Sequence, residues 1–108
     1  MAIFAVTDER LTALLAERIM GWSVAPERFL LGKRRWISRW RFQPTESLDD
    51  AFKLLEKAAP QDYSMGDDGQ GFWVRVRIGK AIGEARDRTK PRAITLALAR
   101  ALGLEVDS

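Results

Sequence analysis

The alternation of apolar and polar side chains over residues 72–78 is the feature that most constrains how this chain can fold. The apolar members are Phe72, Val74, Val76 and Ile78, and the residues between them are Trp73, Arg75 and Arg77. Successive side chains of a β-strand point to opposite faces, so the pattern predicts a strand with one buried and one exposed face. Gly79-Lys80 follows directly and fits a two-residue hairpin turn with glycine at its first central position. We therefore expect an antiparallel hairpin here.

The turn sets the register of the strand that follows, within an antiparallel meander that we place at residues 61–87. Arg75 comes opposite Glu84 and Trp73 opposite Arg86, which predicts a cross-strand ion pair and an arginine stacked on an indole. The inward-facing residues of the second strand are all small: Ala81, Gly83 and Ala85. Small side chains on that face leave room for a helix to lie close to the sheet.

Three further segments have apolar residues at helical spacing, and we expect helices at residues 7–21, 47–59 and 90–103. Thr7 and Ser47 are suited to cap the first two of these helices. A glycine or proline stands at each expected end: Gly21, Pro60 and Gly103. The buried stripe expected for the second helix consists of Leu48, Ala51, Phe52, Leu55 and Ala59.

Residues 35–42 alternate at period two and predict one more strand. Trp36, Ser38, Trp40 and Phe42 would share one face of it, and Arg35, Ile37, Arg39 and Arg41 the other. Tryptophans at this spacing are more often packed than exposed, so we expect a basic outer face. Residues 23–34, interrupted by Pro26 and Gly32, give no regular element.

Taken in order, the predicted elements are helix, strand, helix, three strands and helix. This order predicts an α+β fold, in which an antiparallel sheet of three to four strands is packed with three helices. The arrangement is an α-β-α sandwich around an α-β-β-β-α core. A chain of 108 residues has the common length of one domain, so we expect residues 1–108 to form a single domain.

The composition excludes several kinds of chemistry. The chain has no cysteine and no histidine, which rules out disulfides, thiolate metal sites, cysteine nucleophiles and histidine general bases. We expect no catalytic residues, no cofactor and no bound metal, and hence a binding protein rather than an enzyme. The remaining enzymatic alternative is a site built from aspartate and lysine alone.

We also find no targeting signal in the sequence. No apolar run has the length needed to cross a bilayer, and the N-terminal residues lack the basic start of a signal peptide. With no cysteine to form a disulfide, we expect a cytoplasmic protein that does not act at a membrane.

The first candidate binding segment combines five cations with two tryptophans. Its residues are Lys33, Arg34, Arg35, Trp36, Arg39, Trp40 and Arg41. Such a segment could bind a nucleic-acid strand by charge and stacking, or form a protein interface, because tryptophan and arginine are favoured interface anchors. The alternative is an ordinary strand with packed tryptophans and solvated arginines.

The second candidate is the polar face of the predicted hairpin. It consists of Trp73, Arg75, Arg77, Arg86 and Arg88. It would act as an exposed basic surface, or else as a sheet edge that its charges keep soluble.

Several segments resemble the phage ABA sandwich domain, a small α-β-α domain encoded by bacteriophages and prophages. The matching segments are Glu17 to Trp22, Pro44 to Ser47, Ala51 to Lys57, Gly83 to Ala85, Thr89 to Ile94 and Ala101 to Gly103. The helix end Met20-Gly21-Trp22 and the helix start from Thr89 to Ile94 are the more specific parts. Residues 23–43 depart from the family, which often has a tryptophan-rich, acidic or glycine-rich segment there.

This resemblance implies a fold and a phage origin, and it supplies no activity or site residues. It implies a small accessory protein in the host bacterial cytoplasm. We expect it to bind a host protein or protein complex, with host defence machinery as one target class. The oligomeric state stays open.

From Ser47 onward the element order is also similar to that of the double-stranded RNA-binding domain. Gly79 to Glu84 followed by Thr89 to Ala93 resembles that module's last hairpin and the basic start of its last helix. The module grips phosphates with lysines at this helix start, whereas Pro91 and Ile94 stand here where further cations belong. The resemblance makes nucleic acid the alternative partner, and the affinity for it would fall as the salt concentration rises.

Overall fold

The computed structural model describes residues 7–104. The helical elements are α1 (Asp8–Leu15), the π-helix η1 (Ala16–Met20), the 3₁₀-helix η2 (Arg39–Arg41), α2 (Leu48–Ala58) and α3 (Lys90–Ala101). The strands are β1 (Ser23–Val24), β2 (Arg28–Gly32), β3 (Arg35–Ser38), β4 (Asp62–Asp67), β5 (Phe72–Ile78) and β6 (Ala81–Asp87). Within these residues the predicted α+β fold is confirmed, with three α-helices and two three-stranded antiparallel sheets.

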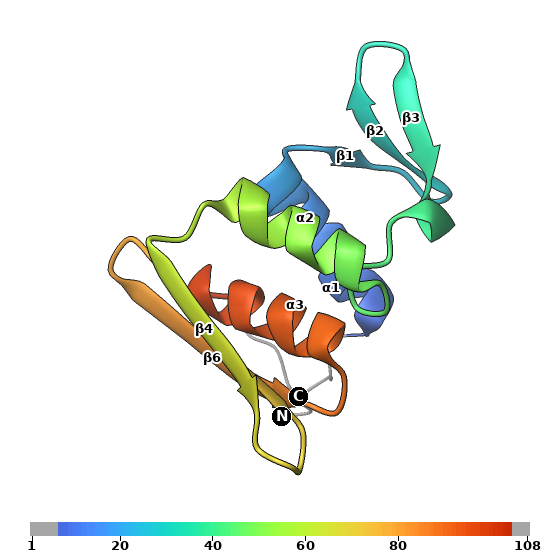
Figure 1. Cartoon of the computed structure of the whole chain (residues 1–108). Helices are drawn as coiled ribbons and strands as arrows, with labels where there is room; N and C mark the ends of the chain where they lie inside the picture. Colours follow the sequence, from blue (N-terminus) through green and yellow to red (C-terminus); the bar gives the residue numbers. More distant parts are fainter. Residues whose placement is uncertain (1–6, 105–108) are drawn as a thin grey trace, which may run out of the picture.

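The elements are stacked from one end of the molecule to the other (Figure 1). The β4-β5-β6 sheet packs on α3, and α3 packs in turn on α1 and α2. Residues 93–99 of α3 are all buried, because this helix is covered by the sheet on one side and by helices on the other. The β1-β2-β3 sheet lies beyond α1 and α2, and its β2–β3 hairpin projects away from the body.

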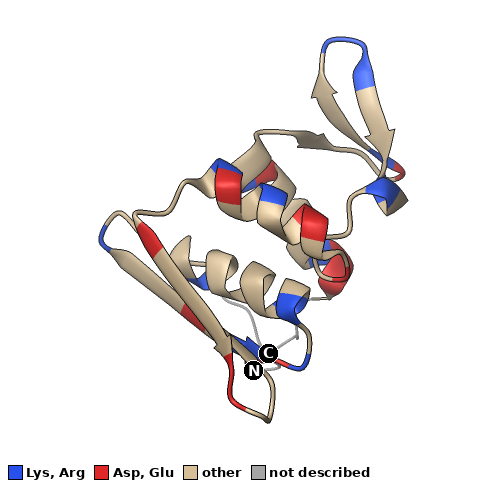
Figure 2. Ribbon diagram, in the orientation of Figure 1, with Lys and Arg blue, Asp and Glu red and all other residues tan. Residues whose placement is uncertain are grey.

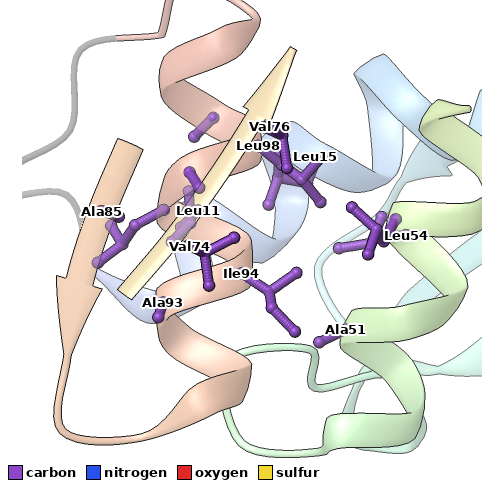
Figure 3. Close-up of a cluster of buried hydrophobic side chains, with 14 of the residues drawn as sticks. Leu11, Leu15, Ala51, Leu54, Val74, Val76, Ala85, Ala93, Ile94 and Leu98 are labelled. Carbon is purple, nitrogen blue, oxygen red and sulfur yellow. The ribbon is translucent and has the colours of Figure 1, made fainter. Parts of the chain in front are cut away.

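The hydrophobic core lies between the sheet and the helices (Figure 3). Val74 and Val76 from β5 meet Ile94 and Leu98 from α3, and Leu54 from α2 closes the far side. The alternation that predicted β5 is confirmed, since these two valines are buried while Arg75 is exposed.

The predicted hairpin register is confirmed at every pair. Ile78 pairs with Ala81, Arg77 with Ile82, Arg75 with Glu84 and Trp73 with Arg86. The small face of β6 does admit a helix: a Cβ added at Gly83 would collide with the backbone of Ala97 and Ala101 in α3. Glycine is therefore required at this position for the close approach of helix and sheet.

The predicted helix ends are confirmed in part. The Thr7 hydroxyl accepts a hydrogen bond from the Arg10 N–H at 3.1 Å, and the Ser47 hydroxyl accepts one from the Asp50 N–H at 3.3 Å. Gly21 ends the first helical segment with a left-handed backbone, φ 74°. That segment is not α-helical throughout, because its last five residues form η1. In α2 the predicted stripe was wrong at both ends, because Leu48 and Ala59 are exposed, and it left out Leu54, which is fully buried.

Residues 23–42 differ most from expectation. The segment predicted to be irregular forms β1 and β2, and the strand predicted over 35–42 ends at Ser38, where η2 begins. Its faces are also reversed: Ile37 pairs with Phe29 and packs against the core, while Trp36 is exposed. Phe29, which is fully buried, decides the orientation, because its cross-strand partner must share the same face.

A charged cluster connects two segments that lie far apart in the sequence. The Arg92 guanidinium donates to Asp8 at 3.0 Å and to Asp87 at 2.8 Å. Burial by itself raises the pKa of Asp87, but hydrogen bonds from the Thr89 backbone N–H and from Arg92 outweigh it, so this pKa lies below its usual value. The cluster fastens the start of α1 to the loop between β6 and α3.

Among residues 7–104, no helix is both long and apolar enough to span a membrane.

Candidate binding surface

The outward face of the β2–β3 hairpin carries exposed apolar side chains. Leu30 on β2 pairs directly with Trp36 on β3, and they are 40% and 54% exposed. Trp40 on η2 is 71% exposed. Exposed apolar groups that gather on one projecting element are typical of an interaction site. We call this the hairpin surface, and its residues are Arg28, Leu30, Lys33, Arg34, Arg35, Trp36, Trp40 and Arg41.

Three aromatic rings anchor the hairpin to the body on its other face. The ring centroids of Trp22 and Phe42 lie 5.0 Å apart, those of Trp22 and Phe29 5.7 Å, and those of Phe29 and Phe42 5.8 Å. The last pair is nearly perpendicular, at 89°, which is a favoured arrangement of aromatic rings. Burial of these rings holds the base of the hairpin against the body. Trp36 and Trp40 take no part in this packing.

The cations of the hairpin surface are not neutralised by acids. Lys33, Arg34, Arg35 and Arg41 form no ion pair within residues 7–104, and Figure 2 shows the hairpin tip as a basic region. The tip therefore presents uncompensated positive charge to a partner.

Two guanidinium groups lie over the exposed indoles. The Arg28 guanidinium lies 5.1 Å from the ring centroid of Trp36, and that of Arg41 lies 5.7 Å from that of Trp40. Each contact is within the range of a cation–π interaction. These contacts restrict both indoles while they remain exposed, so the surface is partly ordered before any partner binds.

The turn between β2 and β3 holds an arginine in an unfavourable backbone conformation. Arg34 has a φ of 63°, a region that residues other than glycine, asparagine and aspartate enter at a cost of about 1–2 kcal/mol. Glycine would fit the turn with less strain. The presence of a long cation at this position points to a role for its side chain.

One predicted member of the surface has a structural role instead. Arg39 is partly buried, and its guanidinium donates to the carbonyl oxygens of Ala25 at 3.3 Å and of Glu9 at 3.4 Å. It also lies over the Phe29 ring, 5.3 Å from its centroid. Arg39 therefore ties η2 to α1 and to the loop before β2.

The second candidate face is charge-compensated. On the outer side of the β4-β5-β6 sheet, Arg75 pairs with Glu84 at 3.3 Å, Arg77 with Asp62 at 3.0 Å and Arg86 with Asp68 at 2.6 Å. The predicted ion pair between Arg75 and Glu84 is thus confirmed. Because Arg86 binds an aspartate, the stacking on Trp73 expected for it is not observed among the described contacts.

The remaining members of that face are Trp73 and Arg88. A Cβ added at Gly66 would come within 2.9 Å of the indole Nε1 of Trp73, so the indole lies close over the neighbouring strand. Arg88 is exposed in the loop after β6. The sheet face and the hairpin surface lie at opposite ends of the molecule (Figure 1), so the structure does not join the two predicted sets into one site.

Sequence reasoning missed Arg28 and Leu30 as surface residues. Phe29, Leu30 and Leu31 are all apolar, so no alternation in the sequence marks Leu30 as the outward residue, and only its pairing with Trp36 on β3 places it there. Within the described residues no group of three or more acidic side chains is placed to hold a metal ion.

Comparison with known proteins identifies similarities in family and fold. A family model for the phage ABA sandwich domain matches residues 13–98. Among solved structures, the chain is similar to a phage protein from Bacillus cereus, with a TM-score of 0.80 at 16% identity. That match covers 99% of this chain and 97% of the other, and at such low identity it speaks for the fold alone. A search of curated proteins found no match.

Proposed function

The chain belongs to the phage ABA sandwich domain family, and from this premise we propose that it is a non-enzymatic phage protein that binds a host protein. The hairpin surface is the proposed contact. A phage protein acts inside an infected bacterium, so a host protein or protein complex in the cytoplasm is the natural partner. Host defence machinery is one class of target, and this part of the proposal rests on phage origin alone.

The observation that carries the proposal is the exposure of Trp36 on the projecting hairpin and of Trp40 on the adjoining η2, beside cations that form no ion pair within residues 7–104. Tryptophan and arginine are the residues most enriched among interface hot spots. Leu30, 40% exposed beside Trp36, adds an apolar centre. Burial of all three side chains against a partner would remove the apolar surface that the isolated chain leaves in water.

A protein partner is favoured over nucleic acid for two reasons. Arg28 and Arg41 already lie over the two exposed indoles, where bases would stack. The arginines of the sheet face, which would extend a phosphate-binding track, are paired with acids. Nucleic acid remains the second candidate, supported by the unpaired cations of the hairpin tip.

Site-specific photo-crosslinking in host cells tests the proposal. A photo-reactive amino acid replaces Arg34 at the hairpin tip or, as a matched control, Arg88 in the exposed loop after β6. We expect a discrete host protein to be crosslinked from position 34 and not from position 88, with a product that resists nuclease. Equal products from both positions, or none from position 34, would overturn the proposal.

A pair of double variants provides the second test. Trp36→Ala with Trp40→Ala is expected to abolish capture of the crosslinked protein, whereas Arg75→Ala with Arg77→Ala on the sheet face should retain it. A nuclease-sensitive product from position 34 would instead establish the nucleic-acid alternative. Binding to that nucleic acid should then weaken by roughly a factor of ten or more between 50 and 200 mM salt.

A further inference from the structure

A pocket of about 320 Å³ opens beside the hairpin surface. It lies between the first turn of α1, the loop before β2, and the segment from η2 to the start of α2. Phe29 and Phe42 provide buried aromatic walls, and Trp40 stands at the rim. Trp40 thus belongs both to the pocket and to the hairpin surface, so a partner on that surface would reach the pocket directly.

Two buried threonines line this pocket, and their hydroxyls have no hydrogen-bond partner among residues 7–104. Thr12 and Thr45 are 7% and 6% exposed and line the pocket. No side-chain hydrogen bond to either hydroxyl exists within the described part of the chain, whereas buried Thr95 donates to the Arg92 carbonyl oxygen at 2.8 Å. Every fully enclosed side-chain polar atom in the described residues does have a partner. The two hydroxyls are therefore accessible to solvent, on residues that line the pocket.

Most of the charged side chains that line the pocket are carboxylates, and its hydroxyl and amide groups can also accept hydrogen bonds. Glu9 and Glu46 line it and form no ion pair within residues 7–104. The third acid, Asp8, is already paired with Arg92. The guanidinium of Arg39 also lines the pocket, but it donates to two carbonyl oxygens and lies over a ring. The carboxylates of Glu9 and Glu46 and the two threonine hydroxyls are thus available to accept hydrogen bonds from a ligand.

We propose that this pocket receives an arginine side chain of the partner protein. A guanidinium offers five N–H donors and no acceptor, which complements two carboxylates and two hydroxyls. Its planar cation also suits an aromatic rim. The volume, at the small end for ligand pockets, matches one side chain rather than a large cofactor. This inference extends the proposed function, since the arginine would lie beside the host contact of the hairpin surface.

NMR titration of the whole chain with N-acetyl-arginine amide tests the pocket without any partner. We expect saturating shifts at the amides of Thr12 and Thr45 and at the indole N–H of Trp40, with a Kd on the order of 1 mM. N-acetyl-citrulline amide, a neutral molecule of nearly the same shape, is the ligand control. Equal affinity for citrulline amide, or shifts that do not saturate, would overturn the assignment.

Variants then separate binding from structure. Glu9→Gln and Glu46→Gln should each weaken arginine amide binding about threefold or more, while Glu56→Gln, on the far end of α2, should not. Thr45→Val should weaken binding without lowering stability, because its hydroxyl has no partner to lose. Thr95→Val should lower stability and leave binding unchanged. Retained binding in Glu9→Gln, Glu46→Gln and Thr45→Val would overturn the proposal.

The two proposals fail separately. If arginine amide does not bind, the assignment of the pocket to an arginine side chain fails, and the crosslinking result from position 34 is unaffected. Absence of crosslinking would remove the host contact and leave the titration result in place.

Discussion

Gly83 of β6 lies directly against the backbone of Ala97 in α3, with no space for even a methyl group between strand and helix. The contact lies in the middle of the interface between α3 and the sheet, which forms the largest part of the core. The separation of sheet and central helix is therefore set by the absence of one side chain.

Gly83→Ala should destabilise the protein by about 1–3 kcal/mol, because the new methyl group must push α3 away from β6. Urea unfolding followed by circular dichroism measures the effect. Gly32→Ala is the matched control: Gly32 is exposed with open space around its Cα, so the change should stay within about 0.5 kcal/mol. Equal unfolding midpoints for the two variants would contradict the close contact.

Asp87→Asn should make the protein less sensitive to acid. The pKa of Asp87 is lowered in the folded state, so its contribution to stability is complete above its unfolded value of about 4 and is lost as the pH falls through the lowered value. At pH 7 the variant should lose about 1 kcal/mol of its free energy of unfolding. Urea unfolding at pH 7 and pH 2.5 should show this difference at the higher pH and little at the lower one. A constant difference would exclude the linkage.

Arg34→Gly should keep or raise stability, by up to about 1 kcal/mol, because glycine relieves the left-handed backbone of the turn. The same variant removes one of the several cations that the proposed interface uses, so capture of the host partner should weaken without being abolished. Chemical denaturation and partner capture, measured on one preparation, check both effects. A loss of stability without a loss of capture would assign Arg34 a purely structural role.

Trp36→Phe combined with Trp40→Phe should remove most of the fluorescence that acrylamide quenches. These two indoles are exposed, whereas Trp22 lies in the aromatic anchor with Phe29 and Phe42. The double variant should unfold within about 0.5 kcal/mol of the parent protein. By contrast, Trp22→Ala should lower the free energy of unfolding by about 3 kcal/mol. An unchanged quenchable fraction in the double variant would show that other indoles are the exposed ones.

Local rules predicted the C-terminal half of the fold well. The period-two alternation of β5, the glycine turn at Gly79 and the small residues of β6 all act between neighbouring strands. Each depends on side-chain size and backbone geometry within a few residues. The register and the packing of α3 follow from them.

The N-terminal half was harder to predict because its orientation is decided at long range. Alternation alone cannot say which face of residues 35–38 is buried. Phe29 decides it by joining Phe42 and Trp22, residues from three separate segments. Burial of that cluster turns Trp36 to solvent, and the expectation of packed tryptophans was wrong for this reason.

The candidate site was predictable only in part. The cations and indoles of residues 33–41 stand together in the sequence, and apart from Arg39 the structure leaves them exposed. The hairpin register predicted the partner of Arg75, but not those of Arg77 and Arg86, which lie on β4 and in the loop after it. The pocket combines residues from α1, the loop before β2, β2, η2 and the segment before α2, which no local pattern links.

The anchor of three rings has a consequence for how such a molecule diversifies. It fixes the base of the hairpin and makes no demand on the chemistry of residues 32–35 at the tip. Side chains at the tip can therefore change while the anchor keeps the base of the hairpin in place.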